Sequence, residues 1–153
     1  MTSTRTSRII KARPEKVYGA FMDPAALANW LPPGEMTGKI HAFDGRAGGG
    51  YRMSLFYPES ERKFRGKTAD KEDMVTVHFV ELIPGRKIIE AVTFRSDDPA
   101  LSGEMRIAVT FEAVASGTKV TFDCMNIPPG LRPEDNEAGT RLSLDQLARF
   151  VES

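Results

Sequence analysis

Two neighbouring stretches in the second half of the chain, residues 103–114 and 118–125, alternate apolar and polar side chains. The apolar positions are Met105, Ile107, Val109, Phe111, Val120, Phe122 and Cys124. Successive side chains of a strand point to opposite faces of a sheet, so this period of two predicts antiparallel strands with one covered face and one solvent-exposed face. The chain must therefore supply an element that covers the apolar face.

Further stretches fit strands of the same sheet. Residues 50–57, 74–83 and 86–94 are rich in β-branched and aromatic residues, and turn sequences such as IPGR separate them. A shorter strand is predicted near the N-terminus, over residues 7–12. The sequence therefore predicts one N-terminal strand and a long antiparallel meander between residues 36 and 125.

Two short helices are predicted between the first strand and the meander. Pro14 suits a first helical turn, where its missing N–H costs no hydrogen bond. Asp23-Pro24 gives an N-cap followed by the same proline signal. The second helix carries Trp30, the only tryptophan of the chain, and ends at the sequence PPG of residues 32–34.

The C-terminal segment is the element that can cover the sheet. An amphipathic helix is predicted from Pro133 onward, with acidic residues near its positive N-terminal end. Its stripe consists of Thr140, Leu144, Leu147, Ala148 and Val151. A meander with one apolar face and one striped helix predict an α+β fold, a curved antiparallel sheet wrapped around the C-terminal helix. We expect a single domain over residues 1–153.

Three segments, ARPEKVYGAFMDPAALANWLPP, IPGRKIIEAVTF and NEAGTRLSLDQLARFVE, carry a resemblance to a known family. They resemble the START-like, or SRPBCC, superfamily, and within it the branch of activator of heat-shock-protein-90 ATPase homologues (AHSA). The resemblance implies a helix-grip fold, commonly with a cavity between sheet and helices. Some members bind lipids, hormones or polyketides, and a few are cyclases or dehydratases. Many relatives carry an aromatic residue near Thr140, so the smaller threonine implies a larger open volume.

The charge balance bears on partners and location. Lys plus Arg and Asp plus Glu each number 21, so the formal net charge is zero and does not favour nucleic acid as a partner. The N-terminal sequence lacks the apolar segment of a signal peptide, and the longest apolar stretch, VHFVELI, is too short to span a bilayer. A single cysteine, Cys124, fits a reducing compartment. We expect a cytoplasmic monomer or homodimer that does not insert into a membrane.

Sequence motifs for catalysis, metal binding or cofactor binding are not found. The glycines of DGRAGGGYRMSL precede a strand, which favours a bulge or a close approach of backbones over a phosphate loop. His41 and His78 lack the spacing of metal ligands. Cys124 lies among apolar neighbours, which predicts a raised pKa and low reactivity. We therefore predict no metal, no cofactor and no catalytic residue.

An apolar cavity is the remaining candidate site. The predicted ligand-binding residues on the concave face are Trp30, Tyr51, Met53, Phe64, His78, Phe94 and Met105. His78 faces inward if it alternates with Val80 and Leu82, and otherwise faces water. Glu104 and Arg106 are further polar candidates. Trp30 either fills the end of the core or stands at the rim of the cavity.

Three functions are compatible with such a chain. The leading hypothesis is that the domain binds a small apolar or amphipathic molecule in the cavity. The first alternative is an enzyme of the polyketide cyclase or dehydratase kind that acts in the same cavity. The second alternative is an interaction module with a chaperone partner, which rests on the family resemblance alone.

Overall fold

The computed structural model describes residues 2–58, 72–95 and 99–152. Its elements are β1 (Ser3–Ile10), α1 (Pro14–Phe21), α2 (Pro24–Trp30), β2 (Thr37–Asp44), β3 (Gly50–Phe56), β4 (Glu72–Ile83), β5 (Lys87–Phe94), the 3-10 helix η2 (Pro99–Leu101), β6 (Met105–Val114), β7 (Gly117–Met125) and α3 (Pro133–Glu152). The predicted order of one strand, two short helices, a meander and a long helix is confirmed. Asp23 caps α2 as expected, since its Oδ1 accepts a hydrogen bond from the Ala25 N–H at 3.0 Å.

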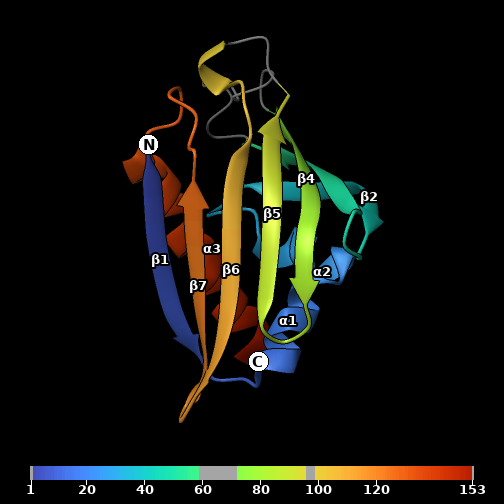
Figure 1. Ribbon diagram of the computed structural model, residues 1–153, viewed down its shortest axis with the longest axis vertical. Helices are drawn as coiled ribbons and strands as arrows, with labels where there is room; N and C mark the ends of the chain where they lie inside the picture. Colours follow the sequence, from blue (N-terminus) through green and yellow to red (C-terminus); the bar gives the residue numbers. More distant parts are fainter. Residues whose placement is uncertain (1, 59–71, 96–98, 153) are drawn as a thin grey trace.

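The seven strands form one antiparallel sheet in the order β1-β7-β6-β5-β4-β3-β2. Figure 1 shows this sheet in front of the helices, with β2 at the edge that curls away. Helix α3 packs along β1 and contacts both short helices. Four apolar residues of its predicted stripe are buried, namely Leu144, Leu147, Ala148 and Val151. The α+β helix-grip fold is therefore confirmed.

Polar contacts attach α3 to the edge strand β1. The Arg8 guanidinium lies 2.7 Å from the Asp145 carboxylate, and the Asn136 side-chain amide donates a hydrogen bond to the Thr4 hydroxyl at 2.9 Å. These contacts fix the helix along one side of the concave face. None of the helices in the described ranges is long and apolar enough to cross a membrane.

Strand β2 was not predicted as a separate strand. It lies at the edge of the sheet, and all of its side chains are exposed or half-buried. Its pairing with β3 shifts between Ile40 and Ala42, and the bulged His41 places its Nε2 2.7 Å from the Ser54 hydroxyl. Because a bulge interrupts the alternation and neither face is fully covered, the sequence signal for this strand is weak.

The glycine-rich turn before β3 brings two backbones close together. Gly50 has a φ of +155°, and a Cβ at this position would overlap the carbonyl oxygen of Val77 on β4. The neighbouring Gly49 carbonyl accepts a hydrogen bond from the Phe79 N–H at 2.9 Å. The interpretation of these glycines as a close backbone approach is confirmed.

Candidate functional site

The concave face of the sheet is not filled along the whole length of α3. The C-terminal half of the helix packs its leucines into the core, whereas its N-terminal half presents Asn136, Gly139 and Thr140 to the sheet side. These residues are small, and a cavity of about 250 Å³ lies between them and the sheet. An engineered protein cavity of about 150 Å³ admits benzene. The space beneath α3 is therefore large enough for a small organic molecule.

The cavity has mainly apolar and aromatic walls contributed by every layer of the fold. Helices α1 and α2 and the loop after α2 contribute Phe21, Leu27, Trp30, Leu31 and Pro33. The sheet contributes Tyr51, Leu55, Val75, Val77, Val92, Phe94, Met105, Ile107 and Phe122. Walls of this kind are typical of pockets for small molecules, which combine a large apolar surface with a few placed polar groups.

Trp30 is both a core residue and a wall of the cavity. Its side chain has no solvent exposure, and its Nε1–H donates a hydrogen bond to the Ala20 carbonyl oxygen at 3.0 Å. Its ring meets Phe21 edge to face, with 4.7 Å between the ring centroids. Of the two roles considered for Trp30, the structure therefore favours the core role over a position at the rim, although the buried residue also lines the open volume.

Side chains of α3 hold the loop that follows Trp30. Gln146 donates hydrogen bonds to the carbonyl oxygens of Trp30 and Pro32, each at 2.7 Å, and accepts one from the Gly34 N–H at 2.9 Å. Ser143 donates to the carbonyl oxygen of Leu31 at 2.6 Å. Carbonyl groups at a helix end need such partners. This part of the cavity wall is therefore fixed to the helix that forms its roof.

Glu90 is a buried acidic residue of the cavity wall that was not predicted from the sequence. It lies on β5, the central strand of the sheet, with 7% of its surface exposed, and it lines the cavity. Within the described residues its carboxyl group makes no hydrogen bond. Burial raises the pKa of Glu90 from 4.5 to about 7. The alternation of side chains along β5 could have indicated the inward position of Glu90, because Glu90 shares a strand face with the buried residues Ile88 and Val92.

Two further titratable groups lie near Glu90 on the cavity wall. Burial, and then the negative charge of Glu90, raise the pKa of the Tyr51 hydroxyl well above its usual value. Burial also raises the pKa of the Cys124 thiol, as predicted from the sequence, although hydrogen bonds with Asn136, Thr4 and Thr140 act in the opposite direction. The cavity therefore combines apolar walls with a small set of weakly acidic groups.

The structure brings together four of the residues predicted to bind a ligand. Trp30, Tyr51, Phe94 and Met105 all line the cavity. Met53 is fully buried but does not line it, and a Cβ at Gly38 on β2 would collide with the Met53 methyl group. Met53 is therefore a core residue whose methyl group lies close to β2. Phe64 lies outside the described residues.

His78 does not reach the cavity, and its placement on the concave face is corrected. It is exposed on the outer face of β4, whereas the residues before and after it on the strand, Val77 and Phe79, are buried. The register between β4 and β5 shifts between Phe79 and Glu81. Because such a shift interrupts the alternation of side chains, the face that Leu82 occupies does not predict the face of His78.

The other polar candidates also lie away from the cavity. Glu104 is exposed and lies 3.5 Å from the half-buried Arg106 in an ion pair. Neither side chain lines the cavity.

Solved structures similar to this chain extend over nearly its whole length. Protein CV1439 from Chromobacterium violaceum is 34% identical, with 99% of this chain and 97% of that chain covered and a TM-score of 0.87. An AHSA1-like protein from Aeromonas hydrophila is 18% identical, with 99% and 92% covered and a TM-score of 0.74. DynU16, from the dynemicin biosynthetic locus, is 21% identical, with 99% and 47% covered and a TM-score of 0.71. The last two show a shared fold. No curated protein matches the sequence.

The family assignment rests on a match along the chain. The family described as Activator of Hsp90 ATPase homolog 1-like protein matches residues 11–152, from the residue after β1 through α3. This span contains every residue that lines the cavity, whereas β1, which flanks α3, ends just before it. The chain therefore belongs to the Activator of Hsp90 ATPase homolog 1-like family, the AHSA branch of the SRPBCC superfamily.

Proposed function

We propose that this protein binds a small apolar or amphipathic organic molecule in the cavity beneath the N-terminal half of α3. The observation that carries the proposal is the open volume of about 250 Å³ with mainly apolar walls and few polar groups. A ligand in this position would contact Trp30 and Phe122, which both line the cavity, and would lose most of its contact with water.

The cost of leaving such a space open supports the proposal. Unfilled apolar volume destabilises a folded protein by about 24 cal/mol per Å³. Larger side chains on α3 would fill the volume at no cost in helix propensity, since leucine and methionine are good helix formers. A chain that only had to fold would gain stability from them. Small residues at Gly139 and Thr140 keep the volume open instead.

The proposal can be tested by filling the cavity from α3. Gly139 is helical, and a Cβ at this position has no atom within 4 Å, so Gly139→Phe can place a ring in the open volume. Cyclohexylmethanol is a suitable probe because it is small, mainly apolar and transparent where tryptophan absorbs. We expect a saturable change in Trp30 emission with the unaltered protein and none with Gly139→Phe. Gly139→Ala, which leaves most of the volume open, should still bind the probe. Absence of binding to the unaltered protein would refute the proposal.

A second candidate function is catalysis in the same cavity, and Glu90 is the observation that favours it. A buried carboxyl group with a pKa of about 7 is suited to proton transfer near neutral pH. The neighbouring Tyr51 could hold a developing negative charge on a substrate oxygen. Nitrobenzisoxazole, whose ring opens when a base removes one proton, is the probe for this chemistry. Its turnover should rise with an apparent pKa of about 7 and vanish in Glu90→Gln. Equal rates in the two proteins would exclude this role.

A chaperone-binding function has less support. Among the described residues, the exposed large apolar side chains are Ile9, Val80, Ile83, Met125, Leu142 and Phe150. They are distributed over β1, β4, β7 and α3. Docking surfaces usually present one contiguous apolar patch, and this distribution provides no argument for one. We therefore do not propose that function.

A further inference from the structure

We infer that the cavity selects hydrophobic organic amines, whose ammonium group would bind the Glu90 carboxylate while the hydrocarbon part occupies the apolar walls. This inference rests on the proposed ligand-binding function and adds to it the charge of the ligand. It starts from a glutamate that is more than nine-tenths buried and lines an open volume, and whose carboxyl group has no hydrogen-bond partner among the described residues.

The charges around the cavity favour a cation. The lining residues in the described part of the chain include two acids, Glu90 on the central strand and Asp135 on the first turn of α3, and no Lys, Arg or His. Asp135 is exposed, whereas Glu90 is buried, so an incoming cation meets one negative charge near solvent and another inside. The same two negative charges would repel a carboxylate ligand.

Aromatic rings add a second attraction for an ammonium group. Phe21, Trp30, Tyr51, Phe94 and Phe122 line the cavity, and the faces of such rings attract cations. The Tyr51 hydroxyl oxygen can also accept a hydrogen bond from an ammonium group. A neutral alcohol of the same shape would gain the apolar contacts but not these charge-dependent ones. The walls therefore discriminate by charge as well as by shape.

The energetics of the buried carboxylate favour the same ligand. An ion pair inside a protein usually forms at the cost of removing both charges from water. Above about pH 7 Glu90 is already ionised in its buried position, so only the ammonium group must be desolvated when a ligand enters. An ammonium group next to Glu90 would stabilise its ionised form and lower its pKa, which lies at about 7 in the free protein. Binding of an amine near neutral pH should therefore release protons.

Three probes of matched shape separate the inferred preference for amines from the proposed binding of any small apolar molecule. Cyclohexylmethylamine carries the ammonium group, cyclohexylmethanol is its neutral counterpart, and cyclohexanecarboxylate is the anionic one. A charge-assisted hydrogen bond should make the amine bind at least about tenfold more tightly than the alcohol at about pH 9. The carboxylate should bind most weakly. Calorimetry in buffers of different ionisation enthalpy should show proton release near neutral pH for the amine alone.

Variants assign the effect to Glu90. Glu90→Gln should abolish the preference for the amine and its proton release, while binding of the alcohol persists. Glu112→Gln, which alters an exposed glutamate on β6, should retain the preference. Equal affinity for amine and alcohol in the unaltered protein, or a preference that survives Glu90→Gln, overturns the inference and leaves the proposed function standing. Absence of binding by all three probes overturns both.

Discussion

Replacing Glu90 by glutamine should make the protein more stable at high pH and leave it little changed at low pH. Glutamine has nearly the shape of a protonated glutamic acid and never ionises. In the native protein the pKa of Glu90 is raised from 4.5 to about 7 because the carboxyl group is buried on the cavity wall. Ionisation of Glu90 is therefore more costly in the folded chain than in the unfolded chain.

The sign and size of the effect follow from proton linkage. Between its unfolded and folded pKa values Glu90 binds more protons in the native state, so its contribution to stability is complete below 4.5 and is lost as the pH rises through about 7. Each unit of pKa shift corresponds to about 1.36 kcal/mol. The shift thus amounts to about 3 kcal/mol between low and high pH. Glu90→Gln should recover this amount at high pH.

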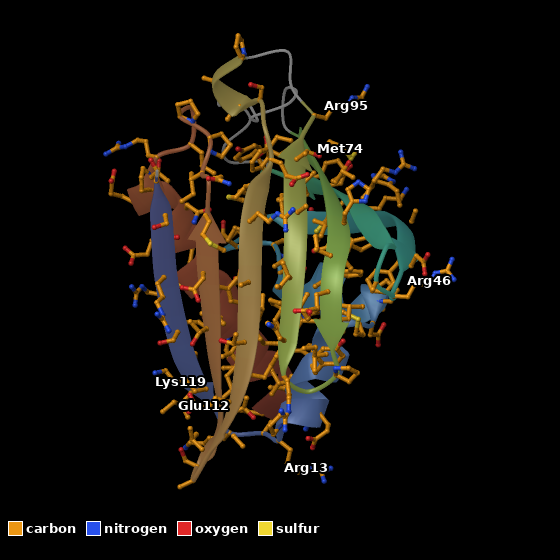
Figure 2. All side chains as sticks on the ribbon, in the orientation of Figure 1. Arg13, Arg46, Met74, Arg95, Glu112 and Lys119 are labelled. Carbon is orange, nitrogen blue, oxygen red and sulfur yellow. The ribbon has the colours of Figure 1, made fainter. Side chains whose placement is uncertain are left out.

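Urea unfolding followed by Trp30 emission provides the assay, since Trp30 is fully buried in the native state. The difference in free energy of unfolding between Glu90→Gln and the unaltered protein should grow by about 3 kcal/mol from about pH 4 to about pH 9. Glu112→Gln is the matched control; Figure 2 shows Glu112 at the lower end of β6 beside Lys119 on β7. A difference that stays the same at both pH values for Glu90→Gln would refute the burial argument.

Four other substitutions test the packing of the protein. Trp30→Ala should destabilise the fold by about 3 to 5 kcal/mol, measured by chemical unfolding followed by circular dichroism, and a smaller loss would contradict its core role. Gln146→Ala should cost about 1 to 3 kcal/mol, because three hydrogen bonds to the loop after α2 are lost. Gly50→Ala should lower the melting temperature because its Cβ would meet the Val77 carbonyl, whereas Gly139→Ala, in open space, should raise it. Shifts of the same sign in both would count against this interpretation.

The overall fold could be predicted from local signals that agree with one another. Proline at helix starts, the Asp23 cap and the alternation of β6 and β7 each correspond to an observed feature. Each of these signals depends only on residues that are close together in the sequence. They can therefore be recognised without knowledge of tertiary contacts. Strand β2 was missed because an exposed edge strand with a bulge has no consistent period of two.

The site was harder to predict because its chemistry depends on which face a charged residue occupies. Glu90 follows the inward alternation of β5, yet a glutamate in a strand is usually read as solvent-facing. His78 could not be placed, because the register shift after Phe79 breaks the parity on which the inference depended. The cavity itself arises from small residues on α3 opposite the sheet, a relation between segments far apart in the sequence.

A crystal structure of the protein with cyclohexylmethylamine bound tests the central claim most directly. The account predicts the ring against the cavity walls that include Trp30, Phe122 and Gly139, with the amine nitrogen about 3 Å from a Glu90 carboxylate oxygen. Density for the amine only on the outer face of the sheet, or an amine in the cavity that points away from Glu90, would contradict it.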